Sequence, residues 1–236
     1  MATNTLSVDF STYDPSNSSV VNFLRANQLN VATYTINKTA DPYGRAFTLN
    51  NTDIQDGYLT MTVSGGTPPG GNVPSSGIRT AFNNILYGTF KTVAITSPVP
   101  GVCHGFFTYK NDSQETDIEI LTAFYTTGND HVRPGLQLTN QNTSNDHSRN
   151  THLAVPYPAD PTEAEHEYKI VWSQNETRQY FDNALIGTLE TNVPSVPSYF
   201  VWNSWSSGND KWSAGPPTED AILRIKSIEL EYETAD

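Results

Sequence analysis

Hydrophobic and polar residues alternate with a period of two along most of this chain. The alternation occurs in short runs separated by turns rich in Asn, Asp, Gly and Pro, which is typical of β-strands. These runs lie at residues 31–36, 58–64, 87–96, 103–110, 115–126, 135–141, 167–173, 177–183, 184–190, 198–205 and 221–233. Their regular spacing predicts an all-β fold, an antiparallel β-sandwich or jelly roll. The last run does not alternate cleanly, so the pattern leaves its buried face undecided.

Helical periodicity is almost absent. Residues 17–29 predict one short helical turn, because serines before it can cap its start. The segment 65–77, GGTPPGGNVPSSG, predicts a loop rather than a domain linker, since β-patterned sequence continues on both sides. A length of 236 residues suits one large β-sandwich, so we expect a single domain over residues 1–236.

Charge narrows the range of partners. The net charge is −12 and the pI is about 4.7, and a strongly acidic surface argues against binding to nucleic acid or anionic lipid. No apolar run in the sequence approaches the ~20 residues of a membrane span. Aromatic residues make up 11% of the chain, which argues against a disordered protein. We expect a monomer that acts without nucleic acid or membrane partners.

The compartment has to be inferred indirectly. The N-terminus, MATNTLSVDF, lacks the basic and apolar regions of a signal peptide, and we interpret its MA as an expression start on a mature secreted sequence. The single cysteine, Cys103, excludes an intramolecular disulfide. Six N-x-[ST] sequons suggest a secreted glycoprotein; they begin at Asn17, Asn37, Asn50, Asn111, Asn142 and Asn175.

The stretch ETDIE at 115–119 carries three carboxylates at alternate positions, Glu115, Asp117 and Glu119. On a strand they share one face, and the opposite face then carries Thr116, Ile118 and Ile120. Neighbouring carboxylates about 6.5–7 Å apart repel each other by about 0.6 kcal/mol in water and by more where the face is dry. A structural strand gains nothing from this repulsion, whereas glycoside hydrolysis needs one ionised and one protonated carboxyl. The alternative is a solvated acidic strand face.

The surroundings of ETDIE resemble glycoside hydrolase family 16. In that family an R-[ST] strand precedes YG-x-[FY]-[EK], then a G-x-x-x-[GS]-FF-[TL]-Y strand, then E-x-D-[IF]-E. Here IRT, YGTFK, GVCHGFFTY and ETDIE follow in this order within residues 78–119. Further on, HEYKIVW, YFDN and VWNSW are similar to later family elements. The resemblance implies a concanavalin A-like β-jelly roll of two curved antiparallel sheets, with a cleft on its concave face.

The resemblance also implies roles for the three carboxylates. Glu115 becomes the nucleophile and Glu119 the general acid/base of a double displacement with retention, and Asp117 between them tunes both. The form ExDxE, without an inserted residue, goes with lichenase-like, xyloglucan-active and chitin–glucan transferase members. We therefore predict a secreted endo-β-glucanase of fungal type that hydrolyses β-1,3/1,4-linked glucans. The rivals are a cell-wall transglycosylase using the same residues and a non-catalytic lectin.

Sugar-binding candidates follow from stacking aromatics and polar side chains near this strand. They are Arg79, Phe107, Gln137, Asn203, Trp205 and Trp212. Structural alternatives remain open for three of them: a surface salt bridge for Arg79, core packing for Trp205 and a loop position without a sugar contact for Trp212. His104 stands alone in a strand and is interpreted as a structural residue.

No cofactor or metal is predicted. Some family members bind calcium on the convex side through an Asp in the last strand, but the matching position here is Ser227. The cluster EAEHE at 163–167 lacks the spacing of a metal site.

Overall fold

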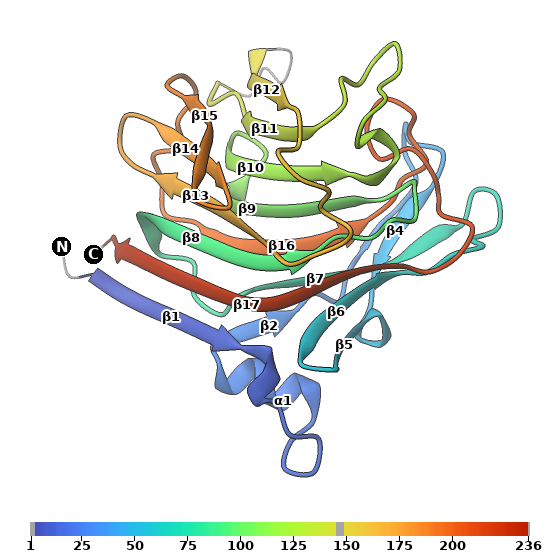
Figure 1. Cartoon of the computed structure of the whole chain (residues 1–236), viewed down its shortest axis with the longest axis horizontal. Helices are drawn as coiled ribbons and strands as arrows, with labels where there is room; N and C mark the ends of the chain where they lie inside the picture. Colours follow the sequence, from blue (N-terminus) through green and yellow to red (C-terminus); the bar gives the residue numbers. More distant parts are fainter. Residues whose placement is uncertain (1–2, 145–148, 236) are drawn as a thin grey trace.

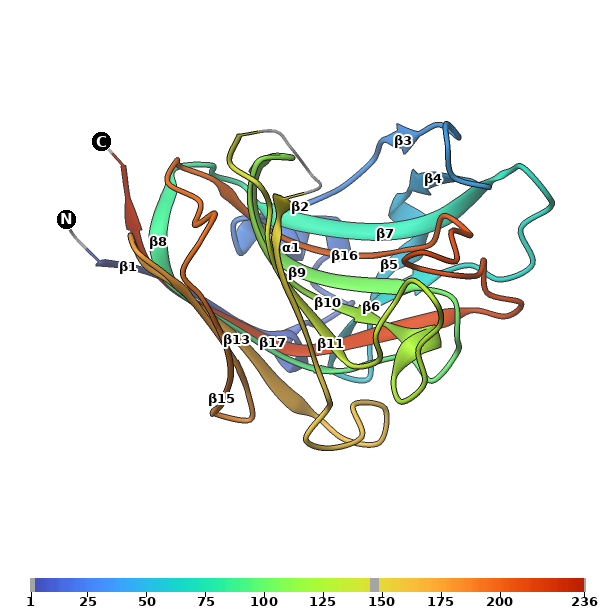
Figure 2. The ribbon, with the colours of Figure 1, turned by 90° about the horizontal axis from the view of Figure 1, so that it is seen from above.

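Two curved β-sheets stacked on each other make up most of the molecule (Figures 1 and 2), as seen in a computed structural model that describes residues 3–144 and 149–235. The first sheet has eight strands. In order across the sheet these are β15 (Ala184–Leu189), β14 (Thr177–Phe181), β13 (His166–Trp172), β8 (Ile85–Ile95), β17 (Ala221–Thr234), β6 (Tyr58–Val63) and β5 (Thr52–Gln55). The eighth strand, β1 (Thr3–Asp9), pairs with the C-terminal half of β17, whereas β6 pairs with its N-terminal half.

The second sheet has nine strands and carries the site. In order they are β12 (Thr151–Val155), β11 (Leu136–Asn140), β10 (Gln114–Leu121), β9 (Cys103–Asn111), β16 (Tyr199–Trp205), β7 (Asn72–Thr80), β4 (Gly44–Phe47) and β3 (Thr35–Ile36), with β2 (Leu29–Val31) also on β7. The pairs in both sheets are antiparallel except for β4 and β7, which run parallel. The predicted all-β jelly roll is confirmed, and the parallel pair is its one departure from an antiparallel design within the described residues.

Helical structure is limited to short segments. The helix α1 (Val20–Ala26) begins after Ser19, whose hydroxyl accepts a hydrogen bond from the backbone N–H of Asn22. This confirms the predicted cap and helix. Three single turns of 3₁₀ helix with full bounds also occur in the described residues: η1 (Phe10–Thr12), η2 (Leu49–Asn51) and η3 (Thr122–Phe124). No helix in the described part of the chain is both long and apolar enough to cross a bilayer.

The core lies between the two sheets. Trp172 and Trp202 are its largest fully buried side chains, and both indole N–H groups are bonded. Trp172 donates to the carbonyl of Pro194 at 2.9 Å, and Trp202 donates across the core to the hydroxyl of Thr92 at 2.8 Å. Burying an indole without such a partner would cost about 1–3 kcal/mol. The hydrogen bond between Trp202 and Thr92 therefore helps to fix how the sheet that carries the site sits on the other.

Two features of the strands differ from the sequence pattern. The last strand, β17, changes register between Ile225 and Ser227. Buried side chains lie at odd positions before this bulge and at even positions after it, from Ile228 onward, because one extra residue turns every later side chain to the other face. The predicted loop 65–77 is wrong in its second half, since β7 already begins at Asn72.

Candidate active site

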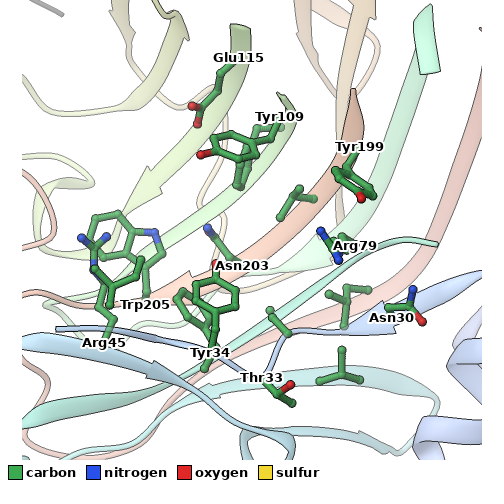
Figure 3. A pocket seen from close by; sticks show the side chains of 18 of the residues that line it. Asn30, Thr33, Tyr34, Arg45, Arg79, Tyr109, Glu115, Tyr199, Asn203 and Trp205 are labelled. Atoms are coloured by element: carbon green, nitrogen blue, oxygen red, sulfur yellow. The ribbon is translucent and has the colours of Figure 1, made fainter. Parts of the chain in front are cut away.

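A groove with a volume of about 840 Å³ runs over the outer face of the nine-stranded sheet. Strands β9, β10, β16 and β7 form its floor, and residues 30–34 and 36 together with 45, 47 and 49 line its other side (Figure 3). This is the sheet face that points away from the core, because Ile118 and Ile120 of β10 are buried among the core residues on the opposite face.

Strand β10 brings three carboxyl groups to the groove, those of Glu115, Asp117 and Glu119. The alternation predicted from ETDIE is confirmed, because all three line the groove whereas Thr116, Ile118 and Ile120 are fully buried on the other face. The strand starts at a tight hairpin, in which the side chain of Asn111 accepts hydrogen bonds from the backbone N–H and the hydroxyl of Ser113. Such Asx turns are a local property of the sequence.

The central carboxyl, that of Asp117, is almost completely buried. Burial and the charges of Glu115 and Glu119 raise the pKa of Asp117 well above its usual range. Asp117 also shares a hydrogen bond with Glu115, and the amide of Gln141 approaches its Oδ2 at 3.5 Å. A protonated Asp117 is the donor in the bond to Glu115, which favours an ionised Glu115.

The outer carboxyls lie in different surroundings. Burial, together with the charges of Glu119 and Asp112, raises the pKa of Glu115 to about 8, and the hydrogen bond from Asp117 opposes that rise. Burial also raises the pKa of Glu119, opposed by hydrogen bonds from Cys103 and Trp212 and by the charge of Arg45. The three groups cannot all be ionised in this space. Chemically, the arrangement can hold one carboxylate and one carboxylic acid on the same wall.

Aromatic rings and two arginines line the rest of the groove. The guanidinium of Arg45 lies 4.3 Å from the centre of the Trp205 ring, and that of Arg79 lies 4.3 Å from the centre of the Tyr199 ring (Figure 3). Tyr109 lies beside Glu115 and donates its hydroxyl to Asp112 at 2.8 Å. Flat rings flanked by charged donors are the surfaces on which sugar rings stack and are oriented.

Comparison with known proteins identifies the family. The family model for glycosyl hydrolases family 16 matches residues 31–221. The chain belongs to glycosyl hydrolases family 16.

Within family 16, this chain is similar to a beta-glucanase of Paenibacillus polymyxa, with 28% identity over 174 residues. That match covers 71% of this chain and 66% of the relative, so it spans slightly less than two thirds of the relative's length. In structure it resembles a Bacillus licheniformis beta-glucanase, with a TM-score of 0.74, 17% identity, and coverage of 97% and 98%. It also resembles a Crh5 transglycosylase in complex with NAG, with a TM-score of 0.67, 19% identity, and coverage of 98% and 84%.

The family-16 groove contains most of the sugar-binding candidates. Arg79, Phe107, Asn203 and Trp205 all line it. Trp212 reaches it indirectly, because its indole N–H donates to Oε1 of Glu119 at 3.1 Å. These positions agree with the predicted contacts, which remain predictions until a sugar is bound.

Gln137 needs a correction. It is fully buried, its amide nitrogen donates to the carbonyls of Gly135 and Arg133 at 2.7 and 3.0 Å, and its amide oxygen lies 3.0 Å from Nε2 of His152. Its side chain is therefore not available to a sugar hydroxyl. The strand pairing places Gln137 beside Glu119, but the local backbone has already taken up its hydrogen bonds.

Several groove residues were missed by sequence reasoning. Tyr199 shares strand parity with Asn203 and Trp205, so a period-two pattern along residues 198–205 would have included it. Arg45 and Tyr34 had no such signal, because they reach the groove only through the pairing of β3 and β4 with the sheet.

The interpretation of His104 as a structural residue is confirmed. It is fully buried in β9, its Nδ1 lies 2.8 Å from the Ser204 hydroxyl, and its Nε2 accepts from the backbone N–H of Ser97 at 3.4 Å. Burial lowers the pKa of His104 to about 3, so it stays neutral. Among the described residues, no group of three or more His, Cys, Asp or Glu side chains is arranged to hold a metal ion.

The raised pKa of Asp117 predicts a pH-dependent cost in stability. An unfolded aspartate titrates near pH 3.9, so the folded protein binds one more proton than the unfolded chain from about that pH up to the folded pKa. The free energy of unfolding falls as the pH rises through this window. We expect Asp117→Asn to melt at a higher temperature than the wild type at pH 7, with the difference vanishing below pH ~4.

Scanning calorimetry between pH 4 and pH 8 measures this effect. The exposed Asp130, changed to Asn, is the matched control and should follow the wild type. Parallel curves of Tm against pH for wild type and Asp117→Asn would show that Asp117 does not take up a proton on folding.

Proposed function

We propose that this chain is a retaining endo-β-glucanase that hydrolyses β-1,3/1,4-linked glucans. The observation that carries the proposal is the row Glu115, Asp117 and Glu119 on one groove wall, with a buried central carboxyl that holds a proton. In this mechanism Glu115 attacks the anomeric carbon while Glu119 gives its proton to the leaving oxygen. Water, deprotonated by Glu119, then hydrolyses the glycosyl-enzyme with retained configuration.

The groove supports a polymeric substrate. Its volume of about 840 Å³ lies in the upper part of the roughly 300–1,000 Å³ found for ligand sites. The rings of Tyr199 and Trp205 lie on β16, two strands away from the carboxyl row on β10, with Tyr199 towards the Glu115 end and Trp205 towards the Glu119 end. This suits a chain that extends past the cleaved bond on both sides, which is the basis for proposing endo action.

A polysaccharide panel tests the proposal. We expect the protein to release short oligosaccharides from lichenan faster than from laminarin, xyloglucan or chitin oligomers, and to lower the viscosity of lichenan early in the reaction. Release of monosaccharide alone, with no early fall in viscosity, would contradict endo action. No turnover on any polymer would leave a carbohydrate-binding lectin as the better account.

Transglycosylation is the second candidate function. It is favoured by the structural likeness to the Crh5 transglycosylase, and it uses the same glycosyl-enzyme on Glu115 with a sugar hydroxyl in place of water. A product time course separates the two functions, since transfer gives oligosaccharides longer than the donor and hydrolysis does not.

The exposure of most sequon asparagines is compatible with a secreted glycoprotein. Asn17, Asn37, Asn50, Asn111 and Asn175 are exposed. Asn142 is 6% exposed, and its Nδ2, the atom that would carry a glycan, donates to the carbonyl of Arg149 at 2.9 Å. In protein secreted from a eukaryotic host, peptide mass spectrometry should find glycans at exposed sequons and none at Asn142; a glycan on Asn142 would contradict this.

Gly105 tests how the groove floor holds Asn203. Gly105 lies between Glu119 and Asn203 in the strand register, and a Cβ there would lie 2.6 Å from Oδ1 of Asn203. That oxygen is buried and has no hydrogen-bond partner among the described residues, so a shift of the amide would change how Asn203 faces the groove. We expect Gly105→Ala to displace the amide and to raise the KM for glucan about tenfold, with little change in Tm.

A double-mutant cycle provides the control for Gly105. Asn203→Ala should raise the KM by a similar factor, and adding Gly105→Ala to it should change little, because the new methyl group then displaces no amide. Additive effects on the KM would mean that Gly105 acts on the groove independently of Asn203.

A further inference from the structure

Two hydrogen-bond donors converge on a single oxygen of Glu119. The thiol of Cys103 lies 3.1 Å from Oε1, and the indole N–H of Trp212 also lies 3.1 Å from Oε1. Oε2 carries no hydrogen bond from residues 3–144 or 149–235, and Glu119 lines the groove. The two oxygens of this carboxyl are therefore not equivalent.

Both groups act as hydrogen-bond donors at neutral pH. Indole nitrogen can only donate. Burial and the charges of Glu119 and Asp117 raise the pKa of the Cys103 thiol well above its usual range, so the S–H stays protonated. Cys103 is fully buried and packs with Leu121, Phe124 and Val132 under the rings of Trp205 and Trp212. This packing keeps water away from the sulfur.

When the carboxyl group of Glu119 is protonated, the surroundings favour the proton on Oε2. A proton on Oε1 would meet two hydrogens that already point at that oxygen, whereas Oε2 is unoccupied. We propose that Cys103 is a positioning residue that, together with Trp212, keeps the acid proton of Glu119 on Oε2 and so directs proton transfer into the groove. This rests on the proposed role of Glu119 as the general acid/base.

The proton transfer then balances as follows. Oε2–H gives its proton to the glycosidic oxygen, the electron pair of the breaking C–O bond stays on that oxygen, and Glu119 is left as a carboxylate. In the second half of the reaction Oε2 takes the proton from water, and Oε1 keeps both donors throughout. The thiol is neither oxidised nor deprotonated in any step.

Other charged groups around Glu119 have to be separated from the effect of Cys103. The charge of Arg45 on β4 lowers the pKa of Glu119. Asp117 and Glu115 lie on β10, the strand that carries Glu119. His152 lies behind Trp212, with ring centres 5.8 Å apart, and burial lowers its pKa. None of these groups touches the thiol, so a substitution at Cys103 leaves their charges in place.

Substitutions at Cys103 give the first test. The alkaline limb of the pH profile of kcat/KM reports the acid of the free enzyme. Cys103→Ala removes a donor to the carboxylate and should move that limb to higher pH by roughly half a unit or more. Cys103→Ser keeps a donor and should leave the limb near its wild-type position. Val102→Ala, which shortens the adjacent buried side chain in a different cluster, should lower Tm without moving the limb.

Infrared spectroscopy gives a second test that needs no turnover. The chain has one cysteine, so the S–H stretching band belongs to Cys103 alone. A thiol bonded to Glu119 should show a band that shifts as Glu119 ionises with pH, and this shift should disappear in Glu119→Gln. A band at one fixed position in both proteins, or pH limbs that are the same for wild type, Cys103→Ala and Cys103→Ser, would overturn the proposal. If no glucan is turned over, the proposed function fails, but the infrared band still decides the role of Cys103.

Discussion

Replacing Glu115 with glutamine is expected to lower turnover of glucan by about 10⁴-fold or more, which is the loss typical of removing an essential nucleophile. Glutamine keeps the shape of the side chain but cannot form the glycosyl-enzyme. It also removes one of the charges that act on Asp117. Initial rates on lichenan measure the effect, and circular dichroism and Tm confirm that the variant is folded.

Two comparisons make the Glu115 result specific. The exposed Glu163, changed to Gln, provides the matched control and should keep wild-type rates. In Glu115→Ala, azide can enter the space left by the side chain and attack the anomeric carbon of an activated β-glucoside, giving an α-glycosyl azide. Unchanged turnover in Glu115→Gln would rule out its role as nucleophile.

Removing Glu119 should produce a loss that depends on the leaving group. A general acid contributes typically 10²–10⁴-fold, so Glu119→Ala should lower lichenan turnover by about that factor. A dinitrophenyl glycoside needs no proton on its leaving oxygen, so formation of its glycosyl-enzyme should be nearly unaffected. Pre-steady-state release of dinitrophenol measures that first step separately from hydrolysis.

The second step gives Glu119 its own signature. Without a general base, hydrolysis of the glycosyl-enzyme slows, and azide should restore turnover by attacking the intermediate. The product should then be a β-glycosyl azide, opposite in configuration to the azide product of Glu115→Ala. If the rate of glycosyl-enzyme formation from the dinitrophenyl glycoside fell as much as the turnover of lichenan, Glu119 would not act as the acid.

Much of the candidate site was predictable because it lies on strands with a period of two. The alternation in ETDIE placed the carboxyls on one face and Ile118 and Ile120 on the other, and both placements are confirmed. Asn203 and Trp205 likewise share strand parity and line the groove, whereas Trp202, which lies between Val201 and Asn203, faces the core. Strand alternation is a local property, so it survives without knowledge of the partners of each strand.

Features that depend on long-range pairing could not be predicted in this way. Arg45 reaches Trp205 only because β4 runs parallel to β7, and no local pattern indicates that pairing. The parity of β17 failed because its bulge turns the later side chains to the opposite face. Gln137 lies on β11 and pairs with Glu119, but its amide nitrogen donates to nearby backbone carbonyls instead of facing the groove.

The hydrogen-bond role of Cys103 was also hidden in the sequence. Read as a lone cysteine, it excluded an intramolecular disulfide and indicated nothing more. Its strand register shows that it shares a strand face with Gly105 and Phe107, two residues beyond Gly105, the partner of Glu119 on the neighbouring strand. The second donor to Oε1, Trp212, reaches it from a loop. Strand parity does not predict where a loop places its side chains.

The most direct test of the mechanism is to trap its intermediate. A 2-deoxy-2-fluoro β-glucan oligosaccharide with a dinitrophenyl leaving group forms the glycosyl-enzyme faster than it is hydrolysed, because the fluorine destabilises both oxocarbenium-like transition states and the activated leaving group speeds only the first. Intact mass spectrometry should show one added glycosyl unit, and peptide mapping should place it on Glu115. An adduct on another residue, or dinitrophenol release beyond one equivalent with α-configured sugar and no adduct, would contradict a double displacement at Glu115.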